Sequence, residues 1–274
     1  MKIILAKAKW ERWDQPLLPF LEDAAGAGFS ATEIYIPAMV ESPEECARLH
    51  REAGLGLVAQ IITEGQDVPD HIRCFEERFL KALDCGPLVV NSHSGRDIWS
   101  LDDNLRLFDK TLELEARHGV PICHETHRSR ALFCAPAARA ILAARPELKL
   151  TADFSHWLCV HESDLSDQQE SVAVAISSAC HIHARVGHSQ GPEVADPRVP
   201  EWRQWLDLSL GFWRRIADAR RAGGAAFLTI TPEFGPPPYM PTHPATGEPL
   251  ADAWELNCWM AGFLRRELIA GQPD

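Results

Sequence analysis

No stretch of the sequence approaches the roughly 18 consecutive apolar residues that a membrane-spanning helix requires, so no membrane span is predicted. The eight cysteines form no Cys-x-x-Cys pair and follow no regular spacing, and a chain of 274 residues can build a core without disulfides. We therefore expect reduced, mostly buried thiols. A signal peptide is not predicted either, because Lys7 and Lys9 interrupt the short apolar run at the N-terminus. These absences favour a cytoplasmic protein.

Basic residues are few and scattered. The formal net charge is −12, from 27 Lys and Arg against 39 Asp and Glu, and the basic residues form no stripe or cluster. Such a surface repels a nucleic-acid backbone at long range. We expect a small-molecule ligand and neither nucleic acid nor a membrane as partner, and the sequence is compatible with a homo-oligomer.

The sequence shows a regular alternation of short apolar runs with longer amphipathic segments that end at Gly or Pro. This alternation is typical of parallel strands joined by helices, and the chain length fits the roughly 250 residues of one α/β barrel. No segment has the composition of a linker. We predict a single (β/α)₈ TIM barrel over residues 1–274. The expected strands are residues 3–8, 31–36, 56–62, 87–92, 120–125, 148–153, 181–186 and 226–231.

The helices between these runs are predicted from their apolar spacing and their caps. In residues 101–118 the apolar side chains recur at intervals of three and four, Ser100 is a candidate N-cap, and Gly119 is a candidate helix stop. The same reasoning places a first helix that ends at Gly26 and two last helical segments at 202–221 and 251–269. Residues 191–200 are predicted to be a loop long enough to cover a site.

Polar side chains stand at the carboxyl ends of the predicted strands. In a barrel of this kind, active sites form at that end. Four consecutive runs, the fifth to the eighth, supply in order Glu125, Asp153, His183 and Glu233. Three carboxylates and one imidazole are hard ligands that suit Mn²⁺, Mg²⁺ or Co²⁺ better than a structural Zn²⁺. A single strand-end carboxylate is commonly a helix cap or an ion-pair partner, but three carboxylates and a histidine in this order predict one divalent metal ion.

This order of motifs resembles the xylose-isomerase-like TIM barrels, which include sugar-phosphate isomerases, ketose 3-epimerases, inosose dehydratase and endonuclease IV. The resemblance covers nearly the whole barrel and is nearest to the ketose 3-epimerases and inosose dehydratase. It implies that Glu125, Asp153, His183 and Glu233 hold the metal, and it matches His156 to a family histidine through the Asp-x-x-His spacing. It further implies that Glu125 and Glu233 share proton transfer and that His156 donates a hydrogen bond to a substrate oxygen.

The endonuclease IV pattern is incomplete in this chain. His93 could replace the strand-four ligand of that enzyme, but the third strand has no histidine, and Arg198 stands where a second motif needs one. A trinuclear zinc site is therefore not predicted. With the acidic net charge, the missing ligands argue against a DNA-repair nuclease.

Several further side chains near the strand ends are candidate substrate contacts. Arg185 shares the strand face of His183 and could bind an anionic substrate tail, with an internal ion pair as the alternative. His127, Arg128 and Arg130 could clamp a phosphate or carboxylate, or pair with acidic neighbours. The remaining candidates are His93, His188 and the tryptophans that could stack on a sugar ring or pack in the core, Trp10, Trp13, Trp99 and Trp157.

Three functions remain open on the sequence. The first is a metal-dependent sugar or sugar-phosphate isomerase or epimerase, which removes a proton next to a metal-chelated carbonyl of a ketose-like or keto-acid substrate through an enediolate. The second is a metal-dependent lyase or dehydratase of a keto sugar or keto-inositol, which starts with the same proton abstraction. The third is a non-catalytic sugar-binding barrel, which has no need of a complete metal cage.

Overall fold

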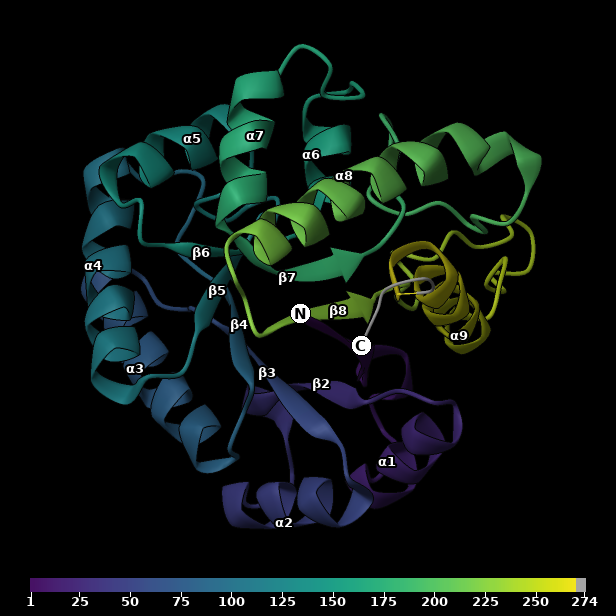
Figure 1. Cartoon of the computed structure of the whole chain (residues 1–274), viewed down its shortest axis with the longest axis horizontal. Coiled ribbons are helices and arrows are strands. Elements are labelled where there is room, and N and C mark those ends of the chain that lie inside the picture. Colours follow the sequence, from purple (N-terminus) through teal and green to yellow (C-terminus); the bar gives the residue numbers. More distant parts are fainter. Residues whose placement is uncertain (270–274) are drawn as a thin grey trace.

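Eight parallel strands form a closed ring. The computed structural model describes residues 1–269, and in these residues each strand pairs with the next along the chain while β8 pairs with β1. Figure 1 shows the ring from one end. The strands are β1 (Lys2–Ala8), β2 (Ala31–Tyr35), β3 (Gly56–Ile62), β4 (Val89–His93), β5 (Ile122–Glu125), β6 (Lys149–Ala152), β7 (Ala179–Ala184) and β8 (Phe227–Pro232).

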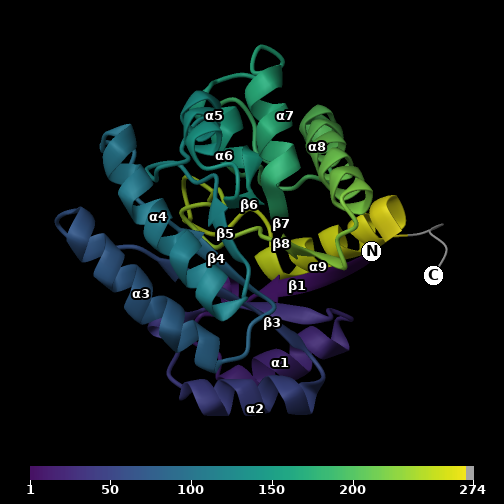
Figure 2. The same cartoon turned by 60° about the vertical axis from the view of Figure 1, so that its left-hand side comes forward.

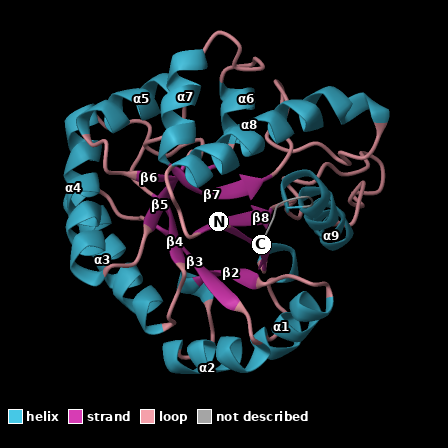
Figure 3. Ribbon diagram, viewed as in Figure 1, coloured by secondary structure: helices cyan, strands magenta, loops and turns pink. Residues whose placement is uncertain are grey.

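Helices cover the outside of this ring, as the cyan ribbons around the magenta strands in Figure 3 and the turned view in Figure 2 show. They are α1 (Leu17–Gly26), α2 (Pro43–Ala53), α3 (Val68–Asp84), α4 (Leu101–His118), α5 (Ala135–Ala144), α6 (Phe154–Val160), α7 (Gln169–Ser178), α8 (Arg203–Ala222) and α9 (Ala253–Leu264). Short 3₁₀ turns lie at η1 (Trp10–Arg12), η2 (Ile36–Ala38) and η3 (Pro200–Trp202). The predicted (β/α)₈ barrel is confirmed.

The predicted strands agree with the observed ones to within two residues at each end, and β3 agrees at both ends. The last predicted helical segment, 251–269, is formed by α9 and by a π-helical turn that follows it directly, η4 (Arg265–Ile269). Asp153, the last residue of the predicted sixth strand, lies directly after β6. The Asp153 Oδ1 accepts the Ser155 backbone N–H at 3.0 Å, and this cap starts α6 at once.

Helix α4 has the two caps that the sequence predicts. The Ser100 hydroxyl oxygen accepts the Asp103 backbone N–H at 3.1 Å, and Gly119 ends the helix in the left-handed region with φ 72°. An N-cap hydroxyl and a left-handed glycine satisfy backbone groups that a helix leaves without partners. The boundaries of α4 are therefore fixed by local chemistry.

Replacing Gly119 by alanine tests the C-cap. A side chain at Gly119 meets no atom within 4 Å, so the cost comes from the backbone conformation alone, and we expect a loss of about 1 kcal/mol in the free energy of unfolding. Gly26→Ala is the matched control, since its position is also open but its φ is not positive. Urea unfolding of both variants measures the difference, and equal stabilities would contradict the capping argument.

The inner faces of the strands carry an apolar floor and a polar mouth. Ile4, Ala6, Ala31 and Val58 form a buried apolar cluster inside the ring. Residues two apart on a strand share a face, so the same inner face continues from Ala31 to Glu33 on β2 and from His181 to His183 on β7. The charged and imidazole groups therefore meet at the carboxyl ends of the strands.

None of the eight cysteines forms a disulfide. Four of them are buried, and the other four are half-buried. The thiols are therefore free, as the sequence predicts. No helix within residues 1–269 combines the length and the apolar character that a bilayer span needs.

Candidate metal centre

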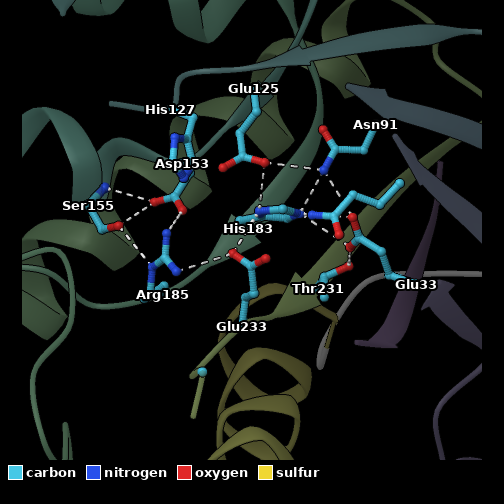
Figure 4. A network of polar contacts seen from close by, with 12 residues as sticks. Glu33, Asn91, Glu125, His127, Asp153, Ser155, His183, Arg185, Thr231 and Glu233 are labelled. Atoms are coloured by element: carbon cyan, nitrogen blue, oxygen red, sulfur yellow. Dashed lines mark hydrogen bonds and ion pairs between the residues drawn. The ribbon is translucent and has the colours of Figure 1, made fainter. Parts of the chain in front are cut away.

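The four side chains predicted to hold a metal lie together at the mouth of the barrel (Figure 4). Glu125 is the last residue of β5, Asp153 directly follows β6, His183 lies on β7, and Glu233 directly follows β8. All four are buried. Ligand atoms of Glu125, Asp153 and His183 lie within 4.8 Å of one another, and the Glu233 Oε2 lies 2.8 Å from the His183 Nδ1. The predicted convergence is present, while the role of these groups as ligands stays a prediction.

Negative charge dominates this centre. Four buried carboxylates, Glu33, Glu125, Asp153 and Glu233, contact the His183 ring or the Arg185 guanidinium. Within residues 1–269, Arg185 is the one Lys or Arg side chain that contacts any of them. Buried carboxylates are stable only when a cation or a set of donors compensates them, so the centre lacks positive charge.

The pKa of the His183 ring reflects this lack of positive charge. Burial alone would lower its pKa, but Glu233, Glu33 and Glu125 together hold the pKa of His183 well above its usual range. The His183 Nδ1 and the Glu233 Oε2 face each other, yet both are buried atoms without a hydrogen bond. A carboxylate oxygen, and a ring nitrogen that can lose its proton to a competing cation, lie side by side in a carboxylate-rich site, which is the arrangement expected for a divalent cation. The residues present therefore fit such an ion.

Asp153 and Arg185 form an ion pair inside the centre. The Arg185 Nη2 donates to the Asp153 Oδ2, and its Nε donates to the Ser155 hydroxyl oxygen at 3.1 Å. Burial raises the pKa of Asp153 to about 6, against the lowering effect of Arg185. Arg185 does line the cavity, as expected for a substrate contact, but its guanidinium is held by these internal partners. The internal ion pair, the alternative considered from the sequence, is present.

Three imidazoles form one wall of the centre. The His93 and His127 rings stack with centroids 4.6 Å apart, and the His127 and His156 rings are 4.0 Å apart. The His93 Nε2 lies 2.6 Å from the Glu125 Oε2. Burial, with the nearby His93, lowers the pKa of His127 to about 3, and burial, with His127, holds the pKa of His156 well below its usual range. His127 and His156 are therefore neutral groups at physiological pH.

Arg185 already occupies one of the two ring nitrogens of His156, which was predicted to donate a hydrogen bond to a substrate oxygen. The His156 side chain is fully buried, and the Arg185 Nη2 lies 2.8 Å from its Nε2, so this nitrogen accepts from the guanidinium. A substrate oxygen would have to replace Arg185 to receive a hydrogen bond from this atom. The donor role of His156 stays a prediction, and its other ring nitrogen, Nδ1, is buried without a hydrogen-bond partner within residues 1–269.

Trp157 and His188 do not line the cavity at the centre. Trp157 is fully buried in the hydrophobic core, its ring stacks on Phe154 at 4.8 Å, and its Nε1 donates to the Leu132 carbonyl oxygen at 2.9 Å. The direction of α6 turns this side chain away from the mouth. His188 packs against the Trp202 ring at 4.8 Å in the loop after β7. The structure thus gives Trp157 the core role that was its alternative.

Glu33 is a member of the centre that the sequence analysis did not identify. Its Oε1 lies 3.1 Å from the His183 Nε2, and the Thr231 hydroxyl donates to its Oε2 at 2.6 Å. Burial would raise its pKa, but His183 and His181 hold the pKa of Glu33 well below its usual range. Glu33, His181 and His183 also form a second cluster of three groups that could hold an ion. The available signal was one carboxylate in the predicted strand 31–36, at a position that shares the face of Ala31.

A cavity of about 750 Å³ opens above these groups. Glu33, Glu125 and Glu233 lie on its floor, and the aromatic rings of Trp10 and Trp13 lie on its wall. Its size falls within the range of roughly 300–1,000 Å³ that is usual for small-molecule sites. Trp10 and Trp13 therefore occupy the position that the sequence analysis expected for stacking residues.

The chain is thus a closed parallel barrel, and a cluster of carboxylates and imidazoles lies at the carboxyl ends of its strands. Solved structures of the same (β/α)₈ fold superpose on this chain over most of its length. A 3-keto-D-glucoside 4-epimerase from E. coli superposes with a TM-score of 0.61 at 13% identity, covering 97% of this chain and 100% of that one. A D-allulose 3-epimerase from Methylomonas sp. superposes with a TM-score of 0.63 at 15% identity, covering 97% of both chains.

A probable 3-DHS dehydratase from Bacillus anthracis also superposes, with a TM-score of 0.58 at 15% identity, covering 85% of this chain and 93% of that one. Endonuclease IV shares the same fold. No protein-family model matches the sequence, and no curated protein matches it. At these identities the likeness establishes the fold, and the reaction has to be argued from the site.

Proposed function

We propose that this chain is a metal-dependent isomerase or epimerase that acts on a ketose-like or keto-acid substrate by moving a proton next to its carbonyl. The observation that carries the proposal is a pair of buried atoms without hydrogen bonds within residues 1–269, the His183 Nδ1 and the Glu233 Oε2, of which Glu233 lines a ligand-sized cavity. The proposed ligands are Glu125, Asp153, His183 and Glu233. Their oxygen-rich set favours Mn²⁺, Mg²⁺ or Co²⁺ over Zn²⁺.

A divalent ion in this position would polarise a substrate carbonyl and acidify the neighbouring C–H bond. Glu125 can remove that proton as a base, because His93 and His183 outweigh burial and hold its pKa well below its usual range. Glu233 lies on the other side of the His183 ring (Figure 4) and also faces the cavity. Removal of a proton by one glutamate and its return by the other would pass through an enediolate and complete an isomerisation or epimerisation.

The two known epimerases of this fold support the proposal, because each, by its name, acts on a keto sugar. The dehydratase of the same fold favours a second candidate, a lyase that begins with the same proton abstraction and then expels a group from the adjacent carbon. The two candidates differ in their product. An isomeric sugar supports the isomerase, and an unsaturated carbonyl compound supports the lyase.

Deuterium exchange tests the proposal directly. The purified protein is first analysed for bound metals, then incubated in D₂O with free and phosphorylated ketoses and with keto acids. We expect deuterium to enter the carbon next to the carbonyl, the exchange to stop after treatment with EDTA, and Mn²⁺, Mg²⁺ or Co²⁺ to restore it. Full exchange by folded protein that contains no metal would overturn the proposed mechanism.

A further inference from the structure

Beside the main cavity, the loops after β3, β4 and β5 enclose a smaller pocket of about 330 Å³. We propose that this pocket binds a phosphate group of the substrate through Arg96 and Arg130. The inference rests on the proposed function and adds to it the substrate class, a phosphorylated keto compound. We name this hollow the arginine pocket, and it is lined by Thr63, Glu64, Gly65, His71, Arg96, Ser129 and Arg130.

Within residues 1–269, neither arginine has a carboxylate partner. The Arg130 Nη1 donates to the Thr63 carbonyl oxygen at 3.0 Å, and its Nε is a buried atom without any hydrogen bond. Within the described part of the chain, the Arg96 guanidinium makes neither a hydrogen bond nor an ion pair. Glu64 also lines the pocket, but its carboxylate is bound by Arg78. Two guanidinium groups without a carboxylate partner in residues 1–269 therefore line one pocket.

The charges in the arginine pocket repel one another. Burial, and then Arg96, lower the pKa of Arg130, and burial, with Arg130 and Arg96, lowers the pKa of His71. A bound dianion would remove this repulsion and accept hydrogen bonds from both guanidinium groups. Arginine binds phosphate well because its planar fork matches two phosphate oxygens.

The backbone that carries the two arginines is held in place before any ligand binds. The Asn104 side chain accepts the Arg96 N–H at 3.2 Å and donates to the Arg96 carbonyl oxygen at 2.9 Å. The Arg130 N–H donates to the His127 carbonyl oxygen at 3.2 Å. A fixed backbone loses little entropy on binding, so only the guanidinium groups have to be ordered by a ligand.

The arginine pocket adjoins the metal centre through shared residues. Arg130 lines both the main cavity and the arginine pocket. The Thr63 N–H donates to the His93 carbonyl oxygen at 3.0 Å, and the His93 ring contacts Glu125. A substrate with its carbonyl over Glu125 could therefore place a phosphate on the far side of Arg130. This proximity favours a substrate group over a separate effector.

Calorimetry with inorganic phosphate tests the arginine pocket without any substrate, on EDTA-treated protein so that phosphate cannot bind a metal. We expect binding that weakens at least about tenfold in Arg96→Gln and in Arg130→Gln, which each remove charge-assisted hydrogen bonds. Arg73→Gln is the matched control, because it removes one exposed charge from the same helix as His71. Absence of phosphate binding in the wild type, or equal weakening in Arg73→Gln, would overturn the inference.

Exchange kinetics then separate this inference from the proposed function. We expect a higher kcat/KM for a phosphorylated ketose than for its free parent, and a loss of that preference in Arg96→Gln through KM with little change in kcat. Exchange with no preference for phosphate would reject the arginine pocket and leave the isomerase intact. Phosphate binding that depends on Arg96 and Arg130, in a protein that exchanges no ketose, would reject the isomerase alone. A preference for free ketoses would mean a separate anion and contradict the inference.

Discussion

Glu125→Gln and Glu233→Gln are each expected to slow deuterium exchange by roughly 10²–10⁴-fold, the usual contribution of a positioned general base. Glutamine keeps the length and shape of the side chain but cannot accept a proton at neutral pH. Both side chains reach the cavity floor from opposite sides of His183, so each is placed to act on one face of the substrate. The exchange rate is measured with the substrate that the deuterium screen identifies, together with the metal content of each variant.

Glu193→Gln is a matched control for these variants. Glu193 is a buried glutamate near the same centre, and its Oε2 accepts the Gly235 N–H at 2.8 Å. Burial raises the pKa of Glu193 to about 8, so its carboxyl group is mostly neutral at pH 7 and glutamine is close to its natural state. We expect this variant to exchange at nearly the wild-type rate. If all three variants lose exchange to the same extent, loss of packing explains the effect better than loss of a base.

The positions of the strands and of the four candidate ligands could be predicted because local rules determine them. The period of two fixes which side chains of β7 point inward, and the carboxyl ends of barrel strands meet at one mouth. Those rules place His183 and Glu125 without any knowledge of packing. They do not say which of the groups at the mouth contact each other.

The features that escaped prediction depend on contacts between distant segments. The Asp153–Arg185 ion pair joins residues 32 positions apart, and the contact of Glu33 with His183 joins residues 150 positions apart. Trp10 and Trp157 both stand near strand ends in the sequence, yet one lines the cavity and the other is in the core. The course of the chain after each strand decides that difference, and the strand pattern carries no information about it.

Glu33→Gln is expected to weaken metal binding by roughly 10–100-fold, the usual effect of removing a carboxylate that orients a metal-binding histidine. The Glu33 carboxylate contacts the His183 Nε2 at 3.1 and 3.2 Å, so it accepts the Nε2–H, and the Nδ1 that faces Glu125 and Glu233 is the nitrogen left to bind a metal once it loses its proton. Glutamine offers at most a neutral acceptor and can turn its NH₂ group toward the ring. Either change makes the required tautomer of His183 less stable, and it also lowers the basicity of the ring.

Titration of the EDTA-treated protein with Mn²⁺ in a calorimeter measures this effect without a substrate. Thr231→Val is the matched control, since it removes the hydroxyl that donates to the Glu33 Oε2 at 2.6 Å but leaves the carboxylate in contact with His183. We expect a smaller loss of affinity in Thr231→Val than in Glu33→Gln, because the orienting charge remains. An unchanged Mn²⁺ affinity in Glu33→Gln would mean that Glu33 does not orient the metal-binding ring, and the second cluster, Glu33 with His181 and His183, would then need another explanation.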